Sequence, residues 1–101
     1  NIGIADASRR KADVPLYTLR RNSNGQTVQT TDPGRALITG RWADIGKFKG
    51  PILRGLQMRP PFFHDGSAAT LQDVINFYNS RFSIGLTPQE QADLLAFLQA
   101  L

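Results

Sequence analysis

The middle third of the chain cannot form a long regular element, because glycine and proline interrupt it throughout. Between Trp42 and Pro61 these two residue types occupy six positions: Gly46, Gly50, Pro51, Gly55, Pro60 and Pro61. Proline lacks a backbone donor and fixes its own φ angle, and glycine loses more conformational freedom than other residues when it is ordered. Residues 32–69 are therefore expected to be mainly loop, with regular structure on either side.

The residues after this loop predict two helices. Apolar side chains recur at helical spacing after Thr70, and Asp73 stands where a capping-box acid stands, which predicts a helix near 71–80. Thr87 and Glu90 form a second capping box with Pro88 at the first helical position, which predicts a helix near 88–100. Its apolar face is expected to comprise Leu94, Leu95, Leu98 and Leu101. A short link through Gly85 predicts that residues 70–101 pack as a helical pair.

The N-terminal third predicts an arm followed by a β-hairpin over residues 1–31. Residues 1–14 show no apolar period, whereas Leu16 to Thr31 contain two β-prone segments around Asn22-Ser23-Asn24-Gly25. Asn24-Gly25 suits the positive φ angles of a tight hairpin turn. Asp32-Pro33 then resembles a helix start, so a short helix is expected through Ile38, ending at Gly40.

Composition limits the chain to one domain with a modest core. It has 101 residues and no cysteine, which excludes disulfides, thiolate metal sites, a cysteine nucleophile and haem attachment through CxxCH on this chain. No apolar run approaches the roughly 18 to 20 residues that cross a bilayer, so no membrane span is expected. The expected fold class is mainly α, with long loops.

Charge is concentrated in the first part of the chain. Residues 1–60 carry 11 basic and 4 acidic side chains, a net +7, whereas residues 61–101 carry 1 basic and 4 acidic, a net −3. The basic part suits haem propionates, an acidic partner or nucleic acid, or it is simply a solvated surface. Nucleic acid is disfavoured, because neither predicted helix has a basic recognition face. A small basic interaction module without haem remains the alternative function.

Two scarce side chains could carry chemistry. His64 lies between an aromatic pair and Asp65-Gly66, where an imidazole can bind a metal, move a proton or hydrogen-bond the backbone. Met58 can bind haem iron through its thioether, or fill a gap in a core. His64, Asp65 and Ser67 do not suggest a hydrolase, because no nucleophile elbow surrounds the serine. The chain alone is therefore not expected to be a complete enzyme.

Several short motifs in order resemble a known family. They are Phe48-Lys49-Gly50-Pro51-Ile52-Leu53-Arg54, Arg59-Pro60-Pro61-Phe62-Phe63-His64-Asp65-Gly66, Thr70-Leu71, Phe77-Tyr78 and Gly85-Leu86-Thr87-Pro88-Gln89-Glu90. Together with Leu94 to Leu98 they are similar to the C-terminal section of c-type cytochromes of the di-haem cytochrome c peroxidase superfamily. The resemblance covers roughly residues 47–101.

The resemblance implies a partial cytochrome c-like fold over residues 1–101, in which residues 32–69 face a haem. It implies haem c in the parent protein, electron transfer that can serve a peroxidase-type reaction, a redox partner protein and a periplasmic or secreted location. The missing CxxCH is expected on an upstream haem-bearing segment or chain, separated by truncation or proteolysis. A degenerate domain that never bound haem is the other interpretation.

The resemblance also implies roles for five residues. Arg54 corresponds to an arginine near a haem propionate, and His64 corresponds to the histidine of the family's Phe-His-Asp-Gly turn. Met58 or His64 is the candidate axial ligand of the haem iron. Phe63 stands where some relatives place a methionine, and the loop from Trp42 to Phe63 is expected to cover one haem edge.

Overall fold

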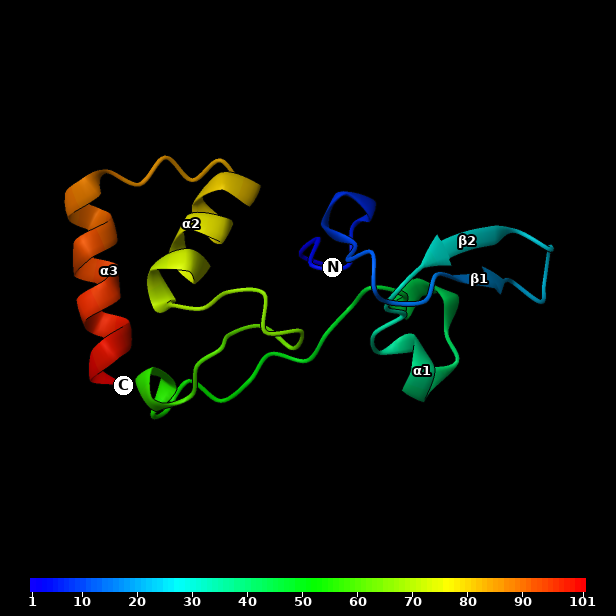
Figure 1. Cartoon of the computed structure of the whole chain (residues 1–101), viewed down its shortest axis with the longest axis horizontal. Helices are drawn as coiled ribbons and strands as arrows, with labels where there is room; N and C mark the ends of the chain where they lie inside the picture. The colour runs from blue at the N-terminus through cyan, green and yellow to red at the C-terminus, as the bar shows by residue number, and fades with distance from the viewer. The chain divides into compact units, whose positions relative to one another are not determined.

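The computed structural model describes residues 1–101 and divides into two compact units, residues 1–49 and residues 50–101 (Figure 1). The boundary falls inside the loop region 32–69. About 37% of the residues are helical, and one two-stranded sheet lies in the first unit. The helices and the hairpin are thus confirmed, whereas a single cytochrome c-like domain over residues 1–101 stays a prediction.

The predicted hairpin is present in the first unit. Strands β1 (Tyr17–Arg20) and β2 (Thr27–Thr30) pair antiparallel, with Tyr17 opposite Thr30 and Arg20 opposite Thr27. At the turn the Arg21 amide donates to the Gln26 carbonyl over 2.7 Å, and Gly25 adopts a φ of 73°. This positive φ is the conformation for which the Asn-Gly pair is suited.

The hairpin has one inward and one outward face. Tyr17, Leu19, Val28 and Thr30 share a face on which Thr30 is buried, whereas the alternate side chains of both strands are exposed. The arm before the hairpin includes a 3-10 turn, η1 (Ala7–Arg9), and a buried Ile4. The guanidinium of Arg10 donates to the Gln29 carbonyl, which ties the arm to β2.

The short helix begins later than the sequence predicts. Helix α1 spans Ala36–Thr39, so Asp32-Pro33 is not its start. The Asp32 carboxylate instead accepts a hydrogen bond from the Gly34 amide over 2.9 Å, and the Arg35 amide donates to the Lys47 carbonyl over 2.8 Å. Gly34, between Asp32 and Arg35, adopts a left-handed φ of 60°, which a right-handed helix cannot include, so the helix begins only after it. The predicted end at Gly40 is confirmed by its left-handed φ of 65°.

The buried carboxylate of Asp44 joins three segments of the first unit. Asp44 lies in the 3-10 turn η2 (Trp42–Asp44) and accepts a hydrogen bond from the Thr39 hydroxyl over 2.9 Å. Arg35 Nε lies 3.6 Å from one carboxylate oxygen and Lys47 Nζ lies 3.5 Å from the other. The Thr39 hydroxyl foremost, with Arg35 and Lys47, outweighs burial and lowers the pKa of Asp44.

Both helices predicted for the C-terminal third are present in the second unit. Helix α2 spans Leu71–Arg81 and helix α3 spans Pro88–Ala100, and each begins with a complete capping box. In these boxes the Thr70 hydroxyl accepts from the Asp73 amide, and the Thr87 hydroxyl accepts from the Glu90 amide. A 3-10 turn, η3 (Leu56–Met58), lies beside the end of α3 (Figure 1).

The core of the second unit is small. Phe62, Ala68 and Leu71 are buried against one another, and the partly buried side chains that pack on them include Leu95 and Leu98. Only part of the predicted apolar face of α3 packs on this core, because Leu94 and Leu101 are exposed. Within this unit α3 contacts α2 and η3, and it packs on the core cluster through Leu95 and Leu98. Phe97 on α3 is 60% exposed, so the second unit presents a large apolar ring to its surroundings.

None of the helices is long and apolar enough to cross a membrane.

We expect the first unit to lose stability in acid through Asp44. A carboxyl whose pKa is lowered in the folded state stabilises it above the unfolded-state pKa, and this contribution is lost as the pH falls through the folded-state pKa. We therefore expect the free energies of unfolding of the wild type and of Asp44→Asn, measured by urea titration, to differ more at pH 7 than at pH 3. An equal difference at both values would contradict the proposed role of the ionised carboxylate.

Candidate functional site

The structure places four of the five predicted site residues in the second unit. Arg54, Met58, Phe63 and His64 all belong to residues 50–101, on the segment that leads from the unit boundary to α2. Trp42 belongs to the first unit, where it opens η2 and is half-buried. Residues 54–64 therefore carry four of the predicted site residues within one unit.

The loop that carries Arg54 is shaped by Arg59. The Arg59 guanidinium donates to the carbonyls of Ile52 over 2.6 Å and Arg54 over 2.5 Å, and its Nε lies 3.4 Å from the Gly55 carbonyl. Gly55 adopts a left-handed φ of 66°, and its amide donates to the Leu101 carbonyl over 2.8 Å. The side chain of Arg54 is exposed, so this fixed loop presents a guanidinium outward.

Met58 is not a core side chain. It ends η3 and is 83% exposed, so the interpretation of Met58 as a gap-filler is wrong. A methionine buried in a core would be held by many van der Waals contacts, whereas this thioether lies in solvent. Its sulfur is thus accessible to a ligand that approaches the second unit.

The turn that carries Phe63 and His64 is closed by backbone pairing. The Phe62 amide donates to the Ala68 carbonyl over 2.7 Å, and the Ala68 amide donates back over 3.3 Å. Between them Phe63 adopts a φ of 64°, a conformation that is uncommon for a non-glycine residue. Phe62 and Ala68 are buried while His64 is exposed. The turn therefore anchors in the core and presents the imidazole outside it.

Asp65 stabilises this turn through hydrogen bonds with Ser67. Its carboxylate accepts a hydrogen bond from the Ser67 amide over 3.0 Å, as expected for an Asp-Gly turn. Partial burial opposes ionisation, but the hydrogen bonds from Ser67 and the nearby His64 outweigh it and lower the pKa of Asp65. The ionised carboxylate is thus hydrogen-bonded within the turn.

Aromatic rings extend from this turn along α2. The centroids of Phe63 and Phe77 lie 4.9 Å apart in a T-shaped arrangement, and Tyr78 follows at 5.5 Å from Phe77. Tyr78 in turn stacks on Phe82 at 5.9 Å with an interplanar angle of 16°. Sequence reasoning did not include Phe82 in the site. Its spacing of four residues from Tyr78 on a helix was the available signal.

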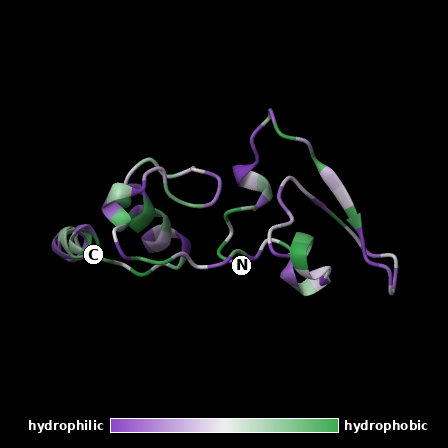
Figure 2. Cartoon of the chain, turned by 90° about the horizontal axis from the view of Figure 1, so that it is seen from below, coloured by the Kyte–Doolittle hydropathy of each residue, from purple (hydrophilic) through white to green (hydrophobic).

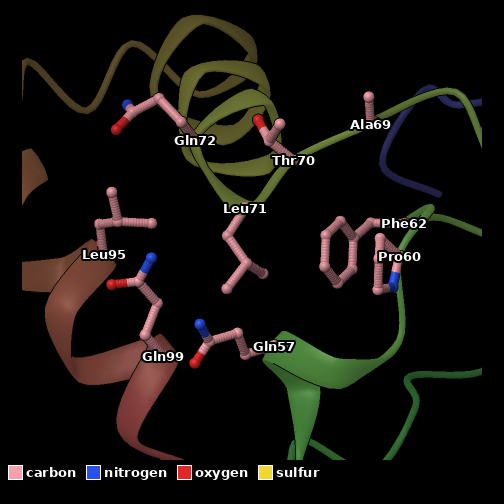
Figure 3. Close-up of a pocket in the computed structure, with 9 residues that line it drawn as sticks. All are labelled: Gln57, Pro60, Phe62, Ala69, Thr70, Leu71, Gln72, Leu95 and Gln99. Atoms are coloured by element: carbon pink, nitrogen blue, oxygen red, sulfur yellow. The ribbon is translucent and has the colours of Figure 1, made fainter.

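The second unit also has a cavity of about 240 Å³, lined in part by Gln57, Pro60 and Phe62 from the segment that carries the predicted site. Leu71 projects between Phe62 and Leu95, with the amides of Gln57 and Gln99 on one side (Figure 3). None of the five predicted site residues lines this cavity. No group of three or more histidine, cysteine, aspartate or glutamate side chains could hold a metal ion.

Known proteins with similar sequences are named as haem peroxidases. The chain is 40% identical over 96 residues to cytochrome-c peroxidase IdrP1 of Denitromonas iodatirespirans, a match that covers 84% of this chain. It is 36% identical over 76 residues to the cytochrome c551 peroxidase of Nitrosomonas europaea, which covers 72% of this chain. The chain belongs to the di-haem cytochrome c peroxidase superfamily.

A further relative carries another name. The chain is 40% identical over 65 residues to the methylamine utilization protein MauG of Methylophilus methylotrophus, a match that covers 54% of this chain and 19% of MauG. The chain spans about a quarter of the length of the curated peroxidases that it matches, 26% of the Denitromonas protein and 23% of the Nitrosomonas protein. No family model and no solved structure matches the chain.

We predict that Arg59 holds the Arg54 loop in its observed conformation. Arg59→Ala removes three hydrogen bonds to carbonyls, so the amides of Gly55, Leu56 and Met58 should exchange with solvent about tenfold faster or more, since hydrogen bonds to charged groups contribute about 1.5–3 kcal/mol. Hydrogen exchange followed by NMR measures these rates. Arg54→Ala is the matched control, because it removes an exposed guanidinium and should leave them unchanged; equal rates in both variants would contradict the assignment.

Proposed function

We propose that this chain is the distal part of a haem-binding c-type cytochrome domain that takes part in electron transfer within a peroxidase-type protein. The observation that carries the proposal is the identity of 35–40% with proteins named cytochrome-c peroxidases, over 70–88% of this chain. The exposed ligand-type side chains of the second unit support it independently. A periplasmic or secreted location and a redox partner protein belong to the same proposal.

The residues present fit a haem by the chemistry of their donor groups. Haem iron accepts a thioether or an imidazole, and Met58 and His64 offer one of each in exposed positions. Haem propionates suit a guanidinium, and the fixed loop presents that of Arg54. Phe63, with the rings that continue from it, offers an apolar aromatic surface next to His64. These groups match the iron, the propionates and the ring faces of one cofactor.

In this proposal each residue holds one part of the haem. Met58 or His64 would bind the haem iron, Arg54 would contact a propionate, and Phe63 would pack against the ring. Trp42 belongs to the first unit, and its place at a haem edge stays a prediction. When bound, the haem supplies reversible one-electron chemistry at iron. Since residues 1–101 contain no cysteine, the covalent bonds of haem c must come from another segment or chain.

The exposed apolar surface of the second unit favours the interpretation that this unit forms only part of a haem pocket. Phe97 and Phe82 are exposed together with Tyr78, and α3 has no buried residue at all. Large aromatic side chains at the surface usually mark an interface or a ligand site, because burying them is strongly favourable. A haem and the segment that carries it would cover such a surface.

We predict that the chain binds haem through one of two side chains. Titration with ferric haem, and with a haem peptide that contains CxxCH, should red-shift the Soret band and raise the unfolding temperature. Either Met58→Leu or His64→Gln should abolish the low-spin bands and weaken binding about tenfold or more, the cost of a lost metal ligand or its support. The other variant then serves as the matched control.

The alternative is a basic module that binds without haem. It would be retained on a nucleic-acid column in a salt-dependent manner and would leave the Soret band of both haem compounds unchanged. That combination would overturn the haem proposal.

A further inference from the structure

Positive charge is a property of the first unit alone. Residues 1–49 contain nine lysine and arginine side chains and four aspartates, a net charge of +5, whereas residues 50–101 contain three basic and four acidic side chains, a net charge of −1. Two of the four aspartates are engaged inside the unit, since Asp44 binds Thr39, Arg35 and Lys47, and Asp32 binds the Gly34 amide. The outer surface of the first unit is therefore strongly basic.

Helix α1 carries two apolar side chains in the midst of this charge. Leu37 is 76% exposed and Ile38 is 90% exposed, although aliphatic side chains of this size favour burial. Arg35 precedes them and Arg41 follows them, and both arginines are exposed. We name these four residues the α1 patch. Figure 2 shows part of the short helix in the colour of hydrophobic residues.

The α1 patch is held in place by hydrogen bonds at both ends of the helix. At its beginning the Arg35 amide donates to the Lys47 carbonyl, and at its end the Thr39 hydroxyl donates to Asp44 and accepts from the Arg41 amide. Gly34 leaves no room for adjustment there, since a Cβ would lie 2.5 Å from the Lys47 carbonyl oxygen. The patch is thus preorganised, which lowers the entropic cost of binding a partner.

The patch also keeps a positive rim. Asp44 supplies one negative charge to both Arg35 and Lys47, so this cluster of three remains net positive. No ion pair of Arg41 is present in the structure. An apolar centre within a charged rim is the usual composition of a protein–protein interface, in which arginine is enriched.

We propose that the α1 patch is the docking surface for a separate acidic protein, one that presents an apolar patch bordered by carboxylates. Charge complementarity selects this partner over a second copy of the chain, which would oppose arginine with arginine. The aliphatic centre of the patch favours a protein partner over nucleic acid as well, because bases stack on aromatic rings, whereas Leu37 and Ile38 are aliphatic. The partner's role as an electron carrier rests on the proposed function; the docking surface does not.

The test uses the 101-residue chain labelled with ¹⁵N and a small, strongly acidic c-type cytochrome in its diamagnetic ferrous form. The largest chemical-shift changes are expected at residues 35–41, with binding that weakens as salt is added. The double variant Leu37→Ser/Ile38→Ser should weaken binding about tenfold or more, because both side chains are exposed and their loss removes the apolar centre.

A matched pair of arginine variants separates this surface from general attraction. Arg41→Gln should weaken binding about threefold or more, whereas Arg20→Gln, the same charge change on the exposed face of the hairpin, should change it less than about twofold. The proposal would be overturned if both variants lost the same affinity, if the chemical-shift changes centred on other residues, or if the cytochrome did not bind. It would also be overturned if duplex DNA, anionic vesicles or self-association perturbed residues 35–41 equally. A failure of haem binding would leave these NMR results unaffected, so the two proposals fail separately.

Discussion

The backbone pairing of Phe62 with Ala68 is the constraint on which the candidate site depends. These two residues are buried against Leu71, the first residue of α2, so the turn between them is fixed to the start of that helix. The pairing leaves His64 exposed, whereas Phe63 is partly buried against the core and contacts Phe77 of α2. Core packing at the two ends of this short segment thereby positions an exposed imidazole and an aromatic surface beside it.

The second unit uses much of its apolar surface outside its own core. α2 buries Leu71 and Ile75, whereas α3 buries no residue and leaves Phe97 in solvent. A unit of about fifty residues stabilised only by this core would be marginal. A cofactor or a further segment over the exposed side would bury this surface, as the proposed function expects; the relatives are about four times as long as the matched region.

Sequence patterns predicted what depends on local interactions. The capping boxes at Thr70 and Thr87 fixed the starts of α2 and α3 because their hydrogen bonds span three residues, and Asn24-Gly25 indicated the hairpin turn. The predicted start of α1 was wrong because Gly34 adopts a left-handed φ of 60° where the backbone pairs with Lys47, a partner far along the chain. The exposure of Met58 and the hydrogen bonds of Arg59 to the Arg54 loop could not be predicted either. Both depend on how η3 packs rather than on the spacing of residues in the sequence.

The central claim is that residues 54–64 form one wall of a haem site, and paramagnetic broadening in NMR tests it most directly. The unpaired electrons of bound ferric haem broaden the resonances of nearby nuclei. With ¹⁵N-labelled chain and ferric haem, we predict the strongest broadening at the amides of Arg54, Met58, Phe63 and His64. Broadening strongest at Gln72, Leu95 and Gln99 would instead place the haem against α2 and α3 and contradict this claim.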